Sequence, residues 1–315
     1  MPDFLGFDTS NYTTSCAVFR SETNEVFQQK KLLPVKSGEV GLRQSDAVFH
    51  HTKQLPPLLN TLIAECGTVN IDSICASCKP RLLEGSYMPC FLVGEGVADN
   101  ISSVMSVTCF KTSHQIGHIL AALYSSGRLD YIHKSEPFIA FHVSGGTTDV
   151  LLCTPCEESV LKVDEIASSL DLKAGQAVDR VGIMLGLDFP CGTGLEKLAL
   201  KADKHFKCKP VIRNGCCCLS GLENKCKELL DNGESRENIA AFCLDFVCET
   251  IIEMTNYAIE KFRKLNIVYA GGVMSDKILQ KKLSQKFDAE FAKPEFSCDN
   301  AVGIAVYAAI KRGLI

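Results

Sequence analysis

Apolar positions along the first half of the chain fall into short runs typical of strands, separated by longer runs with helical periodicity. The short runs predict strands at residues 4–10, 14–20, 25–35, 71–77 and 106–113, and the longer runs predict helices at 46–66, 90–104 and 114–126. Pro56 and Pro57 are predicted to kink or restart the first of these helices.

The same order of strands and helices begins again near residue 136. Strands are predicted at residues 138–153, interrupted by a Ser-Gly-Gly turn, and at 159–168, 265–275 and 290–294. Helices are predicted near 175–186, 194–204 and 236–264, directly after 275, and at 299–313. Asp299 or Asn300 is the expected N-cap of this closing helix, and Gly313 its end.

A shift of 134 residues lays the two halves on each other. Phe7 then falls on Phe141, and Ser10, Thr13 and Thr14 fall on Ser144, Thr147 and Thr148. Because the match lies where the pattern of elements restarts, it predicts a duplicated α/β unit. We expect a first domain at residues 1–135 and a second at 136–315, the latter with a helical insertion around 175–265. Two such domains would form a cleft suited to a ligand.

Composition narrows the class of protein. The chain has 315 residues, is 46% hydrophobic and 22% charged, and carries a net charge of −4, which indicates a globular protein with a sizeable core. This charge argues against a protein coated in nucleic acid and leaves a local basic patch possible. No apolar run reaches the roughly 18 residues of a membrane span, and the first residues lack the basic start of a signal peptide. A cytoplasmic protein without a membrane segment is therefore expected.

Cysteine is abundant, with 17 residues. The odd number and the length of the chain favour reduced cytosolic thiols over a disulfide framework. Two CxxC pairs, Cys75–Cys78 and Cys153–Cys156, lie much farther apart than in a zinc ribbon. The three adjacent thiols of Cys216-Cys217-Cys218 cannot all point in the same direction, and the sequence does not indicate their role.

Two glycine turns follow predicted strands. In HVSGGTTD the candidate ligand-binding residues are His142, Val143, Ser144, Gly145 and Gly146, whose turn could aim N–H groups at an anion or could be an ordinary hairpin. In YAGGVMSD the turn contains Gly271 and Gly272 and leads into a helix, whose N-terminus favours negative charge. Neither turn has the P-loop pattern.

Polar residues at two predicted helix starts are further candidates. Asp179 is either an exposed carboxylate in a favourable first turn or an acceptor for a ribose hydroxyl. The loop that contains Gly192 leads into a helix with Glu196 in its first turn, and could hold a sugar or a base or be a simple connection.

His114 and His118 are spaced to share one helix face and bind one metal. Gln115 stands where a zinc protease of the HExxH type has its glutamate, and an amide cannot act as that general base. A metal needs more ligands, for which Asp299 at the start of the closing helix is a candidate. On spacing alone, two ordinary surface or core-edge histidines remain an equal alternative.

Six short motifs, in order, carry a family resemblance: HQIGH, VSGGTT, GQAVDR, SGLE, AGGV and CDNA. They resemble the TsaD family, the tRNA threonylcarbamoyladenosine transferases formerly called O-sialoglycoprotein endopeptidases. The resemblance implies duplicated actin/hexokinase-type (ASKHA) domains with an inter-domain cleft. It also implies iron or zinc on His114, His118 and Asp299, and transfer of a threonylcarbamoyl group from its adenylate to a tRNA adenosine.

By position, the resemblance implies contacts of ATP or an acyl-adenylate with the 142–146 turn, Asp179, Gly192, Glu196 and Asp276. The chain departs from the family in its first loop, Ser10 to Thr13, where Asn11 and Tyr12 replace an Asp-Glu pair. Gln176 replaces a glutamate, Asp276 replaces an asparagine, and a Gly-Pro-Gly loop is missing near ASCKPRLLEGSYMP.

Three functional hypotheses follow. The first is a metal-dependent threonylcarbamoyl or carbamoyl transferase that uses an acyl-adenylate. The second is a non-catalytic paralogue that binds nucleotide and metal and partners a TsaB-like or TsaD-like protein. The third, disfavoured by Gln115, is a metallopeptidase. A tRNA contact is compatible with the acidic composition if a basic partner shares it.

Overall fold

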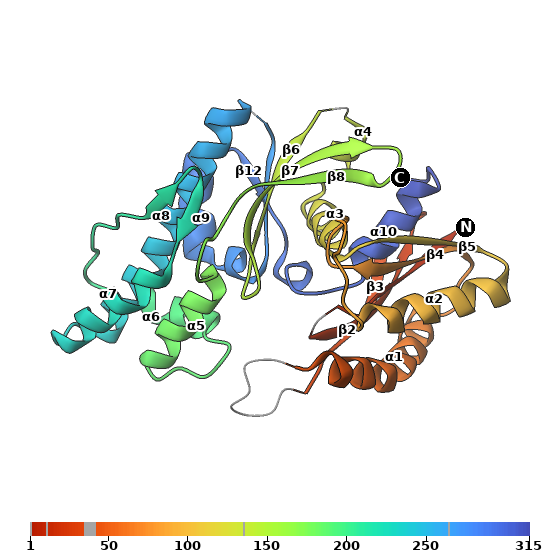
Figure 1. Ribbon diagram of the computed structural model, residues 1–315, viewed down its shortest axis with the longest axis horizontal. Helices are drawn as coiled ribbons and strands as arrows, with labels where there is room; N and C mark the ends of the chain where they lie inside the picture. The colour runs from red at the N-terminus through yellow and green to blue at the C-terminus, as the bar shows by residue number, and fades with distance from the viewer. Residues whose placement is uncertain (1, 11, 35–41, 135, 264) are drawn as a thin grey trace. The chain divides into compact units, whose positions relative to one another are not determined.

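The chain folds into two compact α/β units, seen in a computed structural model that describes residues 2–10, 12–34, 42–134, 136–263 and 265–315 (Figure 1). Unit 1 comprises Met1–Lys134, Pro155–Lys162 and Cys298–Ile315, and unit 2 comprises Ser135–Thr154 and Val163–Ser297. The chain first passes from unit 1 to unit 2 between residues 134 and 135. The closing helix was expected in the second domain but belongs to unit 1, because it packs on the first sheet.

Unit 1 is built on a five-stranded sheet of order β3-β2-β1-β4-β5. Strands β1, β4 and β5 run parallel to one another. Strand β2 pairs antiparallel with β1 on one side and with β3 on the other. Its elements are β1 (Asp3–Asp8), β2 (Thr13–Arg20), β3 (Glu25–Leu32), α1 (Gln44–Cys66), β4 (Ile71–Lys79), α2 (Phe91–Met105), β5 (Thr108–Ser113), α3 (His114–Ser126), α4 (Asp130–His133) and α10 (Val302–Lys311).

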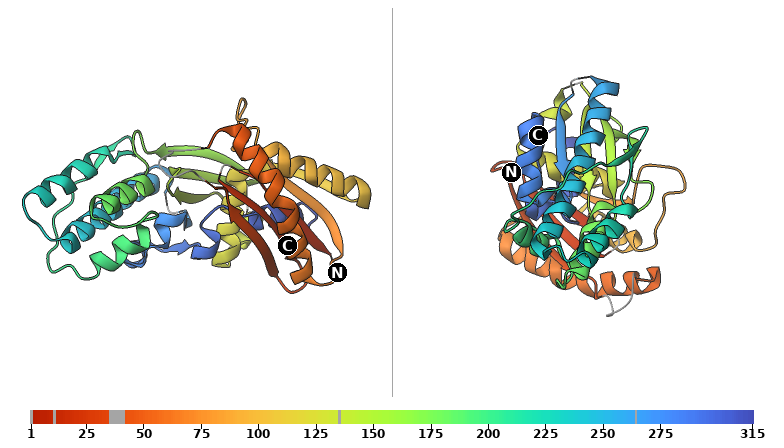
Figure 2. Two further views of the ribbon diagram at one scale, coloured as in Figure 1. Left: turned by 90° about the horizontal axis from the view of Figure 1, so that it is seen from below. Right: turned by 90° about the vertical axis from the view of Figure 1, so that its left-hand side faces the viewer.

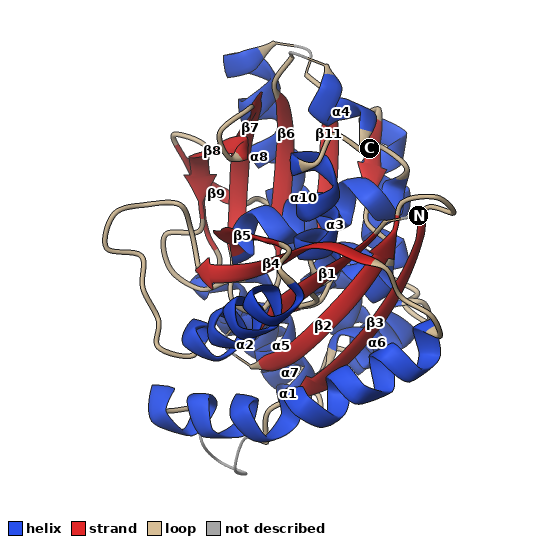
Figure 3. Cartoon of the chain, turned by 90° about the vertical axis from the view of Figure 1, so that its right-hand side faces the viewer, coloured by secondary structure: helices blue, strands red, loops and turns tan. Residues whose placement is uncertain are grey.

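Successive residues of β1 face opposite sides of this sheet, and each side packs against a layer of helices. Leu5 and Phe7 belong to the same buried apolar cluster as residues of α1 and α2. Gly6 points to the other face, where an added Cβ would lie 2.5 Å from the backbone nitrogen of Ala305 in α10. The sheet is therefore covered by α1 and α2 on one side and by α3 and α10 on the other (Figure 3).

Unit 2 contains a second five-stranded sheet, of order β12-β11-β6-β7-β8, and a group of helices, α5 to α8, gathered on one side (Figure 2, left). Its elements are β6 (Phe138–Val143), β7 (Thr148–Cys156), β8 (Val160–Ser168), α5 (Ala174–Met184), α6 (Gly192–Ala199), β9 (Val211–Arg213), β10 (Cys216–Cys218), α7 (Ser220–Asp231), α8 (Arg236–Phe262), β11 (Ile267–Ala270), η1 (Gly272–Ser275), α9 (Lys277–Lys286), β12 (Ala289–Phe291) and η2 (Pro294–Phe296).

Strand pairing confirms the duplication. In the first hairpin Phe7 pairs with Cys16, and in the second Phe141 pairs with Val150, so both partners are related by the predicted shift of 134. The strands parallel to β1 and β6 also correspond, because β4 and β5 hold the places that β11 and β12 hold in the second sheet. By the same register, His142 is the counterpart of Asp8.

Several elements differ from expectation. The first helix is one helix from Gln44 to Cys66, with Pro56 and Pro57 inside it, so no restart occurs. The closing helix starts at Val302 rather than at 299, and its N-cap is Ala301, although Asn300 Oδ1 accepts a hydrogen bond from the Val302 N–H at 3.0 Å. The short elements α4, β9, β10 and α7 were not predicted.

All seventeen cysteines are free thiols. The run at 216–218 forms strand β10, in which Cys217 is buried and Cys216 and Cys218 lie on the other, half-buried face, as the alternation of a strand requires. None of the helices in the described part of the chain is long and apolar enough to cross a bilayer.

Candidate metal centre and glycine turns

The two predicted metal-binding histidines stand at the start of α3. Strand β5 runs directly into this helix, where the Ser113 side chain caps the helix by accepting from the Ile116 N–H at 3.3 Å. His114 is the first helical residue and His118 lies one turn later, so both side chains project from the same face. The cap therefore fixes the backbone that carries the pair.

A close contact between two helices brings the third predicted ligand to this pair. A Cβ on Gly303 of α10 would lie 1.8 Å from the carbonyl oxygen of Gly117 in α3, a distance that no real Cβ adopts. The two backbones can meet because Gly303 has no side chain, and Gly117 leaves room for the Ile304 side chain, whose Cδ1 would lie 2.6 Å from a Cβ at 117. Asp299, which precedes α10, is thereby carried to the histidines, and the bend that presents it is fixed by Asn300, whose Nδ2 donates to Cys298 O at 2.7 Å.

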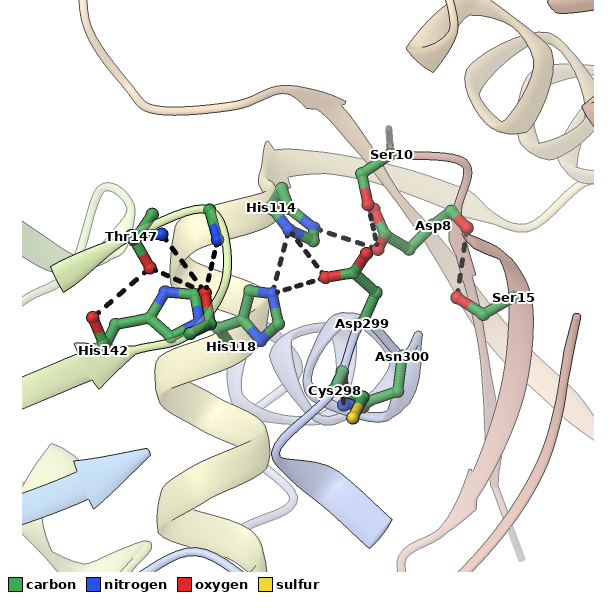
Figure 4. A network of polar contacts seen from close by, with 12 residues as sticks. Asp8, Ser10, Ser15, His114, His118, His142, Thr147, Cys298, Asp299 and Asn300 are labelled. Atoms are coloured by element: carbon green, nitrogen blue, oxygen red, sulfur yellow. Dashed lines mark hydrogen bonds and ion pairs between the residues drawn. The ribbon is translucent and has the colours of Figure 1, made fainter. Parts of the chain in front are cut away.

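The three side chains converge on one point (Figure 4). His118 Nε2 lies 2.9 Å from His114 Nε2 and 3.1 Å from Asp299 Oδ1, and His114 Nε2 lies 3.5 Å from the same carboxylate oxygen. Among the described residues, no other group of three or more His, Cys, Asp or Glu side chains is arranged to hold a metal ion. The three ligand atoms therefore lie close enough together to hold one metal ion.

Asp8 completes the environment of this centre and was not singled out in the sequence. Its carboxylate is fully buried at the end of β1, and Oδ2 lies 3.0 Å from His114 Nδ1. Ser10 donates to Oδ2 at 2.9 Å, and Ser77 donates to Oδ1. A carboxylate that accepts from Nδ1–H turns Nε2 toward the point of convergence. Such a carboxylate is the usual outer partner of a metal-bound histidine.

Electrostatics show that this point attracts positive charge. Burial lowers the pKa of His114, but the carboxylates of Asp8 and Asp299 more than compensate and raise it to about 10. Burial raises the pKa of Asp299, yet hydrogen bonds from both histidines hold it well below its usual value. Two imidazole nitrogens and one carboxylate oxygen around one point, with a second carboxylate behind, form a donor set that fits Zn²⁺ or Fe²⁺.

The first glycine turn lies in unit 2, between β6 and β7. Ser144 Oγ accepts from the backbone N–H groups of Gly146 and Thr147, each at 3.2 Å, and the Ser144 N–H donates to Thr147 O at 2.8 Å. Two of the N–H groups expected to face an anion are therefore used inside the turn. The backbone of His142 also takes part, because its carbonyl accepts from Thr147 Oγ1 at 3.3 Å.

The start of α5 and the second glycine turn both lie against this first turn. A Cβ on Gly175 would lie 2.6 Å from Gly145 N, and one on Gly271, whose φ is +100°, would lie 2.2 Å from Val143 O. The Ala174 N–H donates to Thr148 Oγ1 at 2.8 Å and so ties the helix start to β7. Unit 2 thus brings both predicted glycine turns and the start of α5 together.

Three predicted nucleotide-binding carboxylates hold helix starts in unit 2. Asp179, in the second turn of α5 rather than the first, accepts from Cys191 N at 2.8 Å, directly before Gly192. Glu196 also lies beyond the first turn of its helix and accepts from Lys277 N at 3.1 Å. Asp276 caps α9 by accepting from Ile278 N and Leu279 N. Gly272 of the second glycine turn lies four residues before it in the chain. Each carboxylate thus accepts from at least one backbone N–H at the start of a helix.

The divergent positions have structural partners too. In the first loop, Ser10 serves Asp8, the Tyr12 carbonyl accepts from Leu33 N at 2.7 Å, and Thr13 begins β2 as a buried residue, whereas Asn11 lies outside the described residues. Gln176 takes part in the cap of α5, where its side chain accepts from Lys173 N at 3.4 Å.

Comparison with known families decides where the chain belongs. The family model described as "TsaD: tRNA N6-adenosine threonylcarbamoyltransferase" matches residues 24–306. The chain belongs to the TsaD family. The matched range includes all three members of the His114, His118 and Asp299 centre and both glycine turns.

Solved structures show that this TsaD-family chain has an actin/hexokinase-type (ASKHA) fold. Full-length HypF in a phosphate- and nucleotide-bound form matches with a TM-score of 0.59 at 11% identity, over 99% of this chain and 55% of that chain. Component A of the Acidaminococcus fermentans (R)-2-hydroxyglutaryl-CoA dehydratase matches with 0.56 at 14% identity, over 100% and 99%. The Clostridium difficile 2-hydroxyisocaproyl-CoA dehydratase activator with bound ADPNP matches with 0.54 at 12% identity, over 99% and 95%. The chain therefore spans about half of HypF and nearly all of the other two.

Proposed function

We propose that the chain is a threonylcarbamoyl transferase that moves the acyl group of a threonylcarbamoyl-adenylate to the N6 amine of a tRNA adenosine. The observation that carries this proposal is the family match over residues 24–306, together with a His-His-Asp centre that the same range contains. The nucleotide bound in two structures of the same fold supports an adenylate as the acyl carrier. As part of this proposal, the protein acts in the reducing cytoplasm and works with a TsaB-like partner.

In unit 1, His114, His118 and Asp299 would hold iron or zinc, which as a Lewis acid polarises and orients an oxygen of the acyl-adenylate. Asp8 orients His114 by accepting from Nδ1, so that Nε2 is the nitrogen that would bind the metal in exchange for its proton. Ser10 and Ser77 hold Asp8 in turn, so the ligand is fixed before substrate arrives.

In unit 2, the glycine turns and the start of α5 would bind the phosphate of the adenylate, since a helix N-terminus attracts negative charge. Asp179 and Glu196 each use one oxygen to hold a helix start and have further acceptor positions for ribose hydroxyl groups. These residues would bind and orient the carrier. The N6 amine would form a C–N bond to the carbamoyl carbon while the C–O bond to the phosphate breaks, which releases AMP and a proton.

A second candidate is a paralogue that binds metal and nucleotide without transfer. Asp276 favours it, because a carboxylate stands where the family has asparagine, beside Glu196 and near the expected phosphate. Burial, with Glu196 adding to it, raises the pKa of Asp276 to about 6, so the group is largely charged at neutral pH and would repel an anion.

The two candidate functions differ in whether the protein transfers the threonylcarbamoyl group to tRNA. The protein, loaded with Fe²⁺ or Zn²⁺, is titrated with threonylcarbamoyl-adenylate and then incubated with an unmodified tRNA transcript, with and without a TsaB-like protein, and the nucleosides are read by mass spectrometry. Threonylcarbamoyladenosine in the digest, lost in His118→Ala and kept in the exposed control His133→Ala, supports the transferase. Tight adenylate binding with no modified nucleoside under any of these conditions supports the non-catalytic paralogue.

A further inference from the structure

The connection between α6 and β9 carries an unusual concentration of positive charge. Residues 197–213 contain six Lys or Arg and a single Asp, in a chain whose net charge is −4. From residue 205 to 213 the exposure of side chains alternates strictly along the extended backbone. We call the outward-facing Lys and Arg residues of this stretch the basic strip: Lys207, Lys209 and Arg213.

The inward-facing residues fix the strip on unit 2. Phe206 packs edge-on against Phe242 of α8, with ring centroids 5.8 Å apart, and Cys208 is half-buried beside it. At its start, Asn238 Oδ1 accepts from the N–H groups of Asp203 and Lys204 at 3.1 and 3.2 Å. Because strand residues rise about 3.3 Å each, the outward side chains follow one another at roughly 6–7 Å along a line.

Neighbouring acidic groups already have partners. Glu234 accepts from Lys204 at 2.7 Å, and Asp203 accepts from the Asn238 amide at 2.9 Å. Asp245 pairs with Lys282 and lies 3.1 Å from His205 Nδ1. Within the described part of the chain, Lys207, Lys209 and Arg213 have no carboxylate within ion-pair distance.

A linear, anchored row of unpaired cations suits a partner with regularly repeated negative charge. The exposed face of the strip contains one large apolar side chain, Val211 at 46% exposed, whereas the cores of protein interfaces are rich in aromatic residues and poor in lysine. An acidic chain would repel a polyanion as a whole, so contact requires such a local concentration of charge.

We propose that the basic strip binds the phosphate backbone of the RNA acceptor and so positions it on unit 2. This inference rests on the proposed function for the identity of the acceptor, and on the strip alone for the place of contact. Lysine and arginine at phosphates supply affinity and register rather than sequence readout, so the strip would tolerate different RNA sequences.

The test uses a labelled, unmodified tRNA transcript and measures its affinity for the full chain at several salt concentrations. Each phosphate contact adds about 0.7–0.9 to the slope of log K against log[salt]. The variant Lys207→Gln/Lys209→Gln/Arg213→Gln should lower the slope by roughly 2 to 3 and weaken binding at 100 mM salt by about tenfold or more. The matched control Lys31→Gln/Lys53→Gln/Lys281→Gln removes the same charge from exposed positions elsewhere and should change the slope by less than about 1.

Every outcome decides the proposal. Equal slopes for the wild type and the strip variant overturn the strip as the contact, while the acceptor proposal stands if the wild type still binds and modifies tRNA. An equal loss in the control variant overturns it as well, because net charge rather than the strip is then responsible. A wild type that binds poly-glutamate as tightly as tRNA, or binds no tRNA, also overturns it. Adenylate binding, measured in parallel, reports on the proposed function separately.

Discussion

Replacing Gly303 by alanine tests how the metal centre is assembled. The added Cβ would lie 1.8 Å from Gly117 O and 2.7 Å from Ala121 N, both backbone atoms of α3 that cannot rotate away. Contact at 3.0 Å, the closest that real Cβ atoms show, requires α10 and α3 to separate by about 1 Å or more. We therefore expect both the packing of unit 1 and the placement of Asp299 to suffer.

The magnitude follows from overpacking in a rigid contact. Such changes cost about 1–3 kcal/mol, and a clash with backbone belongs at the upper end. At roughly 2–4 °C per kcal/mol for a domain of this size, the transition of unit 1 should fall by about 6–12 °C. Asp299 Oδ1 lies 3.1 Å from His118 Nε2, so a displacement of this size should weaken metal binding by about tenfold or more.

Calorimetry gives the unfolding transition, and competition with a chromogenic chelator gives the metal affinity. The matched control is Gly96→Ala in α2, also in unit 1, where an added Cβ meets nothing within 4 Å. That control should be stabilised by roughly 0.5–1 kcal/mol, because alanine is the better helix former. A Gly303→Ala protein with wild-type stability and metal affinity would refute the close approach of α3 and α10 as the device that delivers Asp299.

Three further predictions concern single side chains. Asp8→Asn keeps the shape beside His114 but removes the charge, and should weaken metal binding by roughly 10–100-fold in a chelator competition. Asp276→Asn keeps the cap of α9. Because the pKa of Asp276 is raised to about 6 in the folded wild type, the wild type loses stability as pH rises from about 4 to above 6. Urea unfolding should therefore show the variant more stable than the wild type by ~1 kcal/mol at pH 7.5 and equally stable at pH 4. Thr148→Val leaves the buried Ala174 N–H without an acceptor and should lower the free energy of unfolding by about 1–3 kcal/mol, also by urea titration.

Each has a control and a contradicting result. Unchanged affinity in Asp8→Asn would remove this carboxylate from the metal environment. A stability difference between Asp276→Asn and the wild type that is independent of pH would mean that the pKa of the Asp276 carboxyl is not raised in the folded protein. For Thr148→Val the control is Thr61→Val, because the exposed Thr61 hydroxyl donates only within α1. Equal losses of stability in the two variants would show that the hydrogen bond from Ala174 N to Thr148 does not stabilise the fold.

The sequence predicted the repeated sheet because the repeat lies in buried strand residues. Phe7 and Phe141 occupy equivalent central positions, and the same shift relates their partners on the neighbouring strands. Helix α7 was missed because most of its residues are polar: only Leu222 and Cys226 of its twelve residues are buried.

The site was predicted as far as local patterns reach. The spacing of His114 and His118 marks one helix face, and the family motifs pointed to Asp299. Asp8 could not be found in this way, because a polar residue at a strand end is unremarkable until its contact with His114, 106 residues later, is known. Glu196 was named from the sequence, but its hydrogen bond to the start of α9 was not, because Lys277 lies 81 residues away in the chain.

The metal content of the protein tests the central claim most directly. The chain and its His118→Ala, Asp299→Ala and His133→Ala variants are reconstituted with Fe²⁺ or Zn²⁺ without oxygen, desalted, and measured by plasma mass spectrometry with circular dichroism as a check on folding. The wild type and His133→Ala should hold about one metal ion per chain, and the other two variants, although folded, should lose most of it. Equal metal content in all four proteins, or none in the folded wild type, would contradict the account.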